Sequence, residues 1–128
     1  MYNSNVIFPI QLLLKVFKKF KKLNSGEIIN INSIASLEPK VGNEILYSSS
    51  KASIKNFIES LQEEVRVNKL KMRITDVFSA AFKSEITKDR VDFNKLIDPD
   101  EIAELIYEQI LSDKSFYQDK IYLRRTKF

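Results

Sequence analysis

The sequence of 128 residues contains no cysteine, no histidine and no tryptophan, and only two glycines, Gly26 and Gly42. Without cysteine or histidine, the chain can form neither a zinc finger nor a thiolate redox centre, and it has no Ser-His-Asp or Cys-His catalytic set. It cannot form a disulfide bond, which favours a reducing compartment. Two glycines this far apart cannot build the glycine-rich turns that bind phosphate groups.

The charge and hydropathy of the chain are those of an ordinary globular protein. The net charge is +4, from 21 Lys and Arg against 17 Asp and Glu, which permits an anionic partner without requiring one. The most apolar stretch, residues 6–14, is interrupted by Pro9 and Gln11 and is far shorter than the roughly 20 residues of a spanning helix. It also lacks the features of a secretory signal. We expect one soluble, cytoplasmic domain over residues 1–128, without a membrane partner.

Three segments have the hydrophobic period of helices. They are residues 5–22, 45–67 and 98–111, and the last begins with the cap-and-proline sequence DPDE. The apolar arc of residues 5–22 is wide, which predicts contact with two surfaces. The sequence NSG at residues 24–26 then predicts a helix end.

Three short apolar or β-branched segments, residues 27–32, 72–78 and 120–123, predict strands. The first does not alternate cleanly between apolar and polar residues, which predicts a strand covered on both faces. Residues 79–92 are expected to form a loop with a short helix. Strands alternating with long helices predict an α/β fold with a parallel, doubly wound sheet of about three strands and flanking helices.

The residues that point to chemistry are Ser33, Tyr47 and Lys51. Tyr47 and Lys51 are four positions apart in a predicted helix, so their side chains project from one face. A neighbouring ammonium stabilises the phenolate form of a tyrosine, and such a pair can act as a general acid or base. Ser33 follows a predicted strand, where α/β proteins place their ligands, and its hydroxyl can bind a carbonyl oxygen. The spacing by itself also occurs on solvated helix faces.

The surrounding sequence resembles the catalytic half of the short-chain dehydrogenase/reductase family. The segments GEIININSIAS (26–36) and YSSSKASI (47–54) carry the resemblance, with the expected fourteen-residue step from Ser33 to Tyr47. Three further segments resemble that family in the right order: NVIFP (5–9), MRITDV (72–77) and DPDEIA (98–103).

The resemblance implies a role for each matching residue. Tyr47 would exchange a proton with the substrate oxygen, and Lys51 would favour its phenolate and bind the nicotinamide ribose. Ser33 would orient the substrate, and Asn5 would hold a water that links Lys51 to solvent. The implied cofactor is NAD or NADP, the implied substrate is a small alcohol or carbonyl compound, and no metal is implied.

The chain departs from the family pattern after the second strand. Ser79 and Ala80 stand where the family usually has Pro-Gly, and Ser84 stands where a threonine contacts the cofactor. Carried over by position, Tyr47, Lys51, Ser79, Ala80 and Ser84 would contact the cofactor. The family's N-terminal dinucleotide-binding βαβ half, with its glycine-rich turn, has no counterpart here. We therefore expect a truncated chain that binds NAD(P)H weakly by itself.

Two alternatives remain open from the sequence. The first is a non-catalytic oligomerisation module of the same fold, with helices 5–22 and 45–67 pairing between copies, and homo-oligomers are expected in either case. The unpaired edge of a truncated sheet would add to self-association. The second is nucleic-acid binding through the lysine-rich face of residues 15–22 and the basic segment 124–127. The lysine-rich face lacks interleaved aromatic residues, so no nucleic-acid partner is expected.

Overall fold

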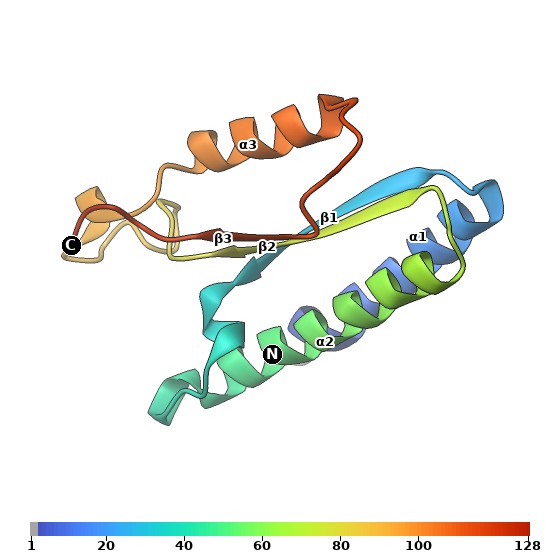
Figure 1. Cartoon of the computed structure of the whole chain (residues 1–128). Helices are drawn as coiled ribbons and strands as arrows, with labels where there is room; N and C mark the ends of the chain where they lie inside the picture. The colour runs from blue at the N-terminus through green and yellow to red at the C-terminus, as the bar shows by residue number, and fades with distance from the viewer. Residues whose placement is uncertain (1–2) are drawn as a thin grey trace.

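The computed structural model describes residues 3–128 and confirms the α/β class, with helices on both faces of a three-stranded parallel sheet (Figure 1). The strands are β1 (Gly26–Ser33), β2 (Met72–Ser79) and β3 (Lys120–Leu123), in the spatial order β1-β2-β3. Both neighbouring pairs are parallel, so each connection must cross over the sheet. The strand positions expected from the sequence are confirmed to within one residue at each end.

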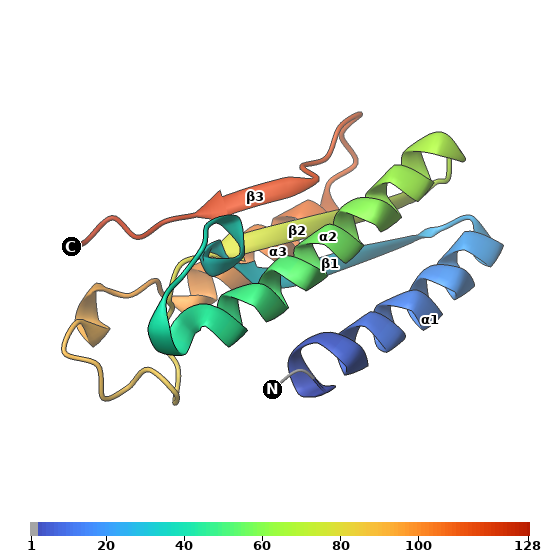
Figure 2. The ribbon, with the colours of Figure 1, turned by 90° about the horizontal axis from the view of Figure 1, so that it is seen from below.

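The helices form one layer on each face of this sheet. Helices α1 (Phe8–Leu23) and α2 (Ile45–Val67) lie side by side on one face (Figure 2), and α3 (Pro99–Leu111) covers the other (Figure 1). The bounds of α2 are those that its apolar period predicts. Asp98 caps α3 by accepting a hydrogen bond from the Asp100 N–H, with Pro99 in the first helical position.

The main hydrophobic core lies between the sheet and the α1–α2 layer. Its most deeply buried members are Ile58 of α2 and Ile74 of β2, each with no exposed surface. Apolar residues of α2 reach this core because they recur at three- and four-residue intervals on one helical face. The buried core residues are Phe17, Ile28, Ile54, Ile58, Leu61, Val65, Met72 and Ile74.

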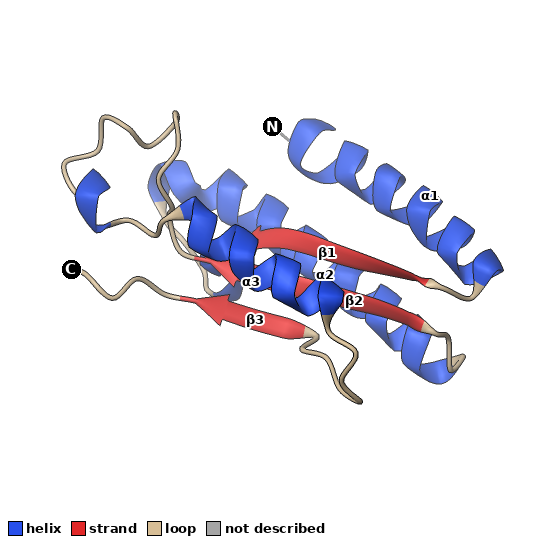
Figure 3. Cartoon of the chain, turned by 90° about the horizontal axis from the view of Figure 1, so that it is seen from above, coloured by secondary structure: helices blue, strands red, loops and turns tan. Residues whose placement is uncertain are grey.

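The first helix begins differently from the prediction. Residues Asn3–Ile7 form a π-helical turn, and the regular helix starts at Phe8. Within α1 only Phe17 is buried, whereas Phe8 and Leu12 are 61% and 51% exposed. Viewed from above, α1 lies beyond the β1 edge of the sheet (Figure 3). The second surface that its wide apolar arc predicts is therefore not supplied by residues 3–128.

The prediction that the first strand is covered on both faces is confirmed only in part, because Glu27 and Ile29 on its second face are half-buried whereas Ile31 is exposed. Ile28 of β1 faces the core and is buried, but Ile31, which points to the opposite face, is 39% exposed. Ile31 is exposed because α3 lies mainly over β2 (Figure 3). In the described part of the chain, β1 also pairs with β2 alone, so its outer edge carries no strand.

Residues 80–98, between β2 and α3, form a series of turns that contacts the C-terminal tail through an ion pair. Phe82 and Ile97 form an isolated parallel bridge. The loop expected in residues 79–92 is confirmed, but the short helix expected within it is absent, and a 3₁₀ turn lies outside this range at Phe93–Lys95. Asp92 binds both Arg90 (2.9 Å) and Arg125 of the tail (2.7 Å). Hydrogen bonds from these two arginines lower the pKa of Asp92 to about 2.

Candidate active site

Ser33 lies at the carboxyl end of β1, where the strand turns into the 3₁₀ turn Ile34–Leu37. Its Oγ caps this turn by accepting the N–H of Ala35 at 3.1 Å, and its carbonyl accepts the hydroxyl of Ser36 at 2.7 Å. The cap uses a lone pair of Ser33 Oγ and leaves its O–H able to donate. Ser33 is half-buried, so the hydroxyl is held but accessible.

Tyr47 and Lys51 lie in the first turns of α2, as their spacing predicts. The Lys51 ammonium is 5.8 Å from the centroid of the Tyr47 ring, and 38% of the Tyr47 surface is exposed. The structure therefore brings this pair together on an accessible helical turn. Such a phenol, with a cation beside it, has the parts of a proton-transfer pair.

Small serines allow the turn that follows Ser33 to pack against the start of α2. Ser48 and Ser50 are buried, and their hydroxyls donate to the carbonyls of Ile45 and Tyr47 in the same helix. Because these hydroxyls are satisfied within the helix, the turn can approach without leaving a buried polar group unpaired. This packing places the Ser33 turn next to the helix that carries Tyr47.

Asn5 lies in the π-helical turn before α1, and this turn also contacts α2. Its side chain is half-buried, with the Ser4 hydroxyl 3.5 Å from its Oδ1. Single π-helical turns are rare and occur frequently at functional sites. Asn5 and the Tyr47–Lys51 pair thus belong to two segments in direct contact.

The three expected cofactor contacts at the end of β2 and after it, Ser79, Ala80 and Ser84, differ in their burial. Ser79 is the register partner of Ser33, but both Ser79 and Ala80 are buried. The Ser79 hydroxyl donates to the Ala80 carbonyl at 2.7 Å, and the Ala80 N–H pairs with Leu123 of β3. Ser84 is half-buried, and its backbone N–H donates to the Thr87 hydroxyl at 2.8 Å. Thr87 is a supporting residue that the sequence reasoning missed.

A second group that the sequence reasoning missed is a buried polar cluster beneath α2. Asp76 of β2 has no exposed surface and accepts hydrogen bonds from Asn30 and Asn32 of β1. Burial, the largest influence, raises the pKa of Asp76 above its usual value, although the two amide bonds act in the opposite direction. Two asparagines at alternate positions of one predicted strand are the signal that could have identified this cluster.

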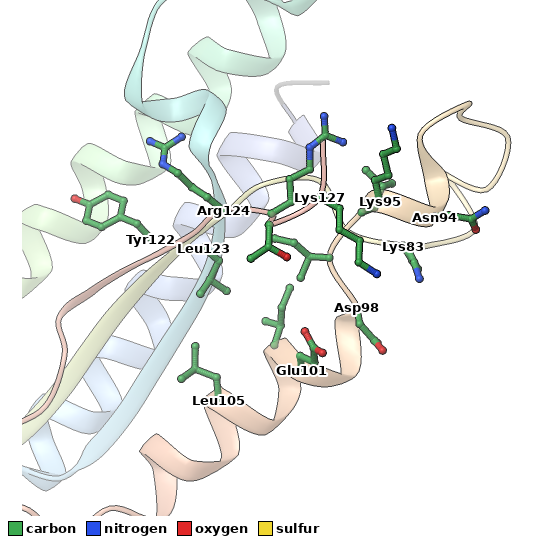
Figure 4. Close-up of a pocket in the computed structure, with 15 residues that line it drawn as sticks. Lys83, Asn94, Lys95, Asp98, Glu101, Leu105, Tyr122, Leu123, Arg124 and Lys127 are labelled. Atoms are coloured by element: carbon green, nitrogen blue, oxygen red, sulfur yellow. The ribbon is translucent and has the colours of Figure 1, made fainter.

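A cavity of about 440 Å³ lies between α3, the end of β3 and the segment before α3 (Figure 4). Leu105 of α3 and Leu123 of β3 face each other across it, and its rim carries both acidic and basic groups, among them Glu101 and Lys127 (Figure 4). Its lining includes none of the site residues predicted from the sequence. Among residues 3–128, no three acidic side chains converge as metal ligands, and no helix is long and apolar enough to cross a bilayer.

Comparisons with known proteins point to one family. Residues 1–95 match the family model described as short chain dehydrogenase. The chain is also 27% identical over 117 residues to the NADP-dependent 3-hydroxy acid dehydrogenase of Schizosaccharomyces pombe. That match covers 83% of this chain and 44% of the S. pombe protein.

Solved structures share the fold over nearly all of this chain. A short-chain dehydrogenase/reductase from Vibrio parahaemolyticus superposes with a TM-score of 0.78 and 22% identity, covering 98% of this chain and 54% of that one. The closed form of a serine dehydrogenase complexed with NADP⁺ superposes with a TM-score of 0.80 and 18% identity, covering 95% and 53%. The chain therefore spans about half the length of the relatives that it matches.

Proposed function

Because this chain belongs to the short-chain dehydrogenase family, we propose that it carries the proton-transfer half of an NAD(P)-dependent oxidoreductase that interconverts an alcohol and a carbonyl compound. The observation that carries the proposal is the accessible Tyr47–Lys51 pair on a helix packed against the turn that Ser33 caps. In the reduction direction, Tyr47 would donate its phenolic proton to the substrate oxygen. The Lys51 ammonium would stabilise the resulting phenolate.

Ser33 would bind the same substrate oxygen. Its Oγ already accepts the Ala35 N–H, so the O–H is the part that remains to point at a ligand. A donor held in place before the reaction stabilises developing negative charge without having to reorganise. Asn5 would join this site through the contact between its π-helical turn and α2.

The residues present fit one end of a dinucleotide better than the other. Lys51 and Tyr47 offer donors for a ribose beside the accessible helical turn, and Ser84 offers a hydroxyl on the segment that follows β2. Ser79 and Ala80 would contribute through their backbone, because Ser79 is occupied by an internal hydrogen bond and both residues are buried. When bound, the nicotinamide supplies or accepts the hydride.

The pyrophosphate end has no comparable partner among the described residues. Gly26 begins β1 beside the Phe20 ring, and Gly42 begins a single 3₁₀ turn before α2 with no second glycine beside it, so neither forms a glycine-rich turn that binds phosphate. We expect the 128-residue chain alone to bind NADPH weakly, with little change in NADPH fluorescence on titration. Tight binding in this titration would contradict the proposal that the cofactor is held mainly outside these residues.

Activity can be tested in a chimaera with the dinucleotide-binding half of the S. pombe enzyme joined to this chain. That relative acts on 3-hydroxy acids by its name, and one structural relative is named a serine dehydrogenase, so hydroxy acids are the substrates to test first. We expect NADP-dependent oxidation of a 3-hydroxy acid. A chimaera that is folded by circular dichroism and binds NADPH, but oxidises no hydroxy acid and reduces no carbonyl compound, would contradict the proposal.

A second candidate function, a non-catalytic oligomerisation module, is supported by the apolar side chains that α1 leaves exposed. Phe8, Leu12 and Leu14 are all at least one-third exposed, and they line a groove of about 520 Å³ along α1. Helix α2 lies alongside α1 (Figure 2). Its first two residues, Ile45 and Leu46, are exposed. Exposed apolar patches of this kind mark interaction surfaces.

Self-association through this surface is expected to depend on Phe8. We expect Phe8→Asp to shift the chain from oligomer towards monomer in sedimentation velocity, because it places a charge in the apolar patch. Leu111→Asp on α3 is the matched control, since Leu111 is 63% exposed on the opposite face of the sheet and should not change the distribution. A parent chain that remains monomeric at high concentration would exclude this function.

A further inference from the structure

The sheet face beneath α1 and α2 changes from apolar to polar residues along β1 and β2. Ile28 and Ile74, which are register partners, belong to the hydrophobic core. Two residues further along, the same face carries the partners Asn30 and Asp76, and then Asn32. Asp76 has no exposed surface and Asn32 is only 4% exposed. A carboxylate is therefore buried in the layer that leads from the core to the candidate site.

The two asparagines satisfy both oxygens of this carboxylate. Asn30 Nδ2 donates to Asp76 Oδ1 at 2.9 Å, and Asn32 Nδ2 donates to Asp76 Oδ2 at 3.1 Å. An ionised carboxylate can only accept hydrogen bonds, so it determines which end of the Asn32 amide faces it. The other end, Asn32 Oδ1, then accepts the backbone N–H of Ser33 at 2.8 Å.

The backbone of Ser33 is thereby held by side chains on both sides. Asn32 Oδ1 binds its N–H, and the Ser36 hydroxyl binds its carbonyl. The Ser33 hydroxyl is in turn directed by the Ala35 N–H. A rotation of the Asn32 amide would present N–H groups to the Ser33 N–H and break the first of these contacts.

We propose that Asp76, acting through the side-chain amide of Asn32, is a positioning residue that holds Ser33 in the orientation in which its hydroxyl can bind a substrate oxygen. This inference rests on the proposed function for the role of Ser33. The physical link between the three residues can be measured without catalysis. Asp76 and Asn32 would not touch the substrate.

Protonation of Asp76 would weaken this link. A protonated carboxyl has an O–H donor in place of one acceptor site and no negative charge, so protonation on Oδ2 would weaken the bond from the Asn32 amide. Burial raises the pKa of Asp76, so this carboxyl takes up a proton at a higher pH than an exposed aspartate does. The charged groups facing it are Lys55 and Glu59 of α2 and Lys120 of β3, and both lysines pair with Glu59.

The test uses nuclear magnetic resonance of the 128-residue chain, with the Asp76 carboxyl carbon and the Ser33 amide followed across pH. We expect both resonances to titrate with the same midpoint, above that of an exposed aspartate. In Asp76→Asn, the Ser33 amide should no longer titrate, and it should exchange with solvent about tenfold faster, as expected for the loss of one hydrogen bond. Asn32→Ala should have the same effect on exchange.

Asn30→Ala is the matched control, because it removes the other amide from Asp76 and leaves the Asn32 contact with Ser33. It should preserve the coupled titration. A Ser33 amide that does not follow the Asp76 carboxyl in the parent chain would overturn the proposal, and this result does not depend on any variant folding. Ser33→Ala in the chimaera tests the proposed function separately. If that variant loses turnover while the coupling is absent, only the positioning role is overturned.

Discussion

Replacing Tyr47 by phenylalanine is expected to lower kcat of the chimaera by about 10²–10⁴-fold, the usual contribution of a general acid or base. The substitution removes one phenolic oxygen and keeps the ring that lies 5.8 Å from the Lys51 ammonium. Helix α2 should therefore retain its packing, and the dissociation constant for NADPH should rise by no more than about tenfold, as expected for the loss of one hydrogen bond to the ribose. Steady-state kinetics and an NADPH titration of the two proteins, side by side, measure both quantities.

Tyr107→Phe provides the matched control for this experiment. Tyr107 lies on α3, on the opposite face of the sheet, and is 63% exposed. The same chemical change there should leave kcat unaltered. If Tyr47→Phe also keeps kcat within about twofold of the parent, Tyr47 does not supply the catalytic proton, since a factor of two is well below the contribution of such a group.

Gly26→Ala is expected to lower the free energy of unfolding of the chain by about 1–3 kcal/mol, because two features of the structure require glycine. Its φ is +142°, a conformation that residues with a side chain rarely adopt. A Cβ at this position would also lie 2.3 Å from Cδ2 of the Phe20 ring. Phe20 packs against the core, so relief of this contact requires the Phe20 ring or α1 to shift relative to β1.

Gly42→Ala provides the comparison for Gly26→Ala. Gly42 has a φ of +62°, but a Cβ there would meet no heavy atom within 4 Å. Gly42→Ala should therefore lower the free energy of unfolding by only about 1–2 kcal/mol, which is the effect of the left-handed conformation alone. Urea unfolding of the two variants measures the difference. A Gly26→Ala variant that is no less stable than Gly42→Ala would show that the Phe20 contact does not constrain the start of β1.

Local patterns predicted most of the secondary structure because each pattern acts over a few residues. The apolar period of α2 and the β-branched run of β3 correspond to the observed elements, and Asp98 and Pro99 begin α3 as capping chemistry requires. The start of α1 was not predictable in this way. A π-helical turn at Asn3–Ile7 has no sequence period of its own and depends on the contact of that turn with α2.

In the candidate site, too, local spacing predicted some features and could not predict others. The Tyr47–Lys51 pair could be predicted because both residues lie on one helix, where a separation of four positions decides the shared face. The position of Ser33 at a strand end could also be predicted. The hydrogen bond between Asn32 and Asp76 could not be predicted, because it joins residues 44 positions apart through the register of two parallel strands.

The sequence by itself determined the α/β order of elements, since this order follows from short-range period and residue type. It also contains the motifs that resemble the family and the residues that we propose to transfer a proton. Only the tertiary structure decided which surfaces are covered. It left Phe8 and Leu12 of α1 at least half exposed and the outer edge of β1 without a strand in the described chain, and it buried Asp76 beneath α2. The physical reason is that burial depends on which elements pack together, and that packing joins residues distant in sequence.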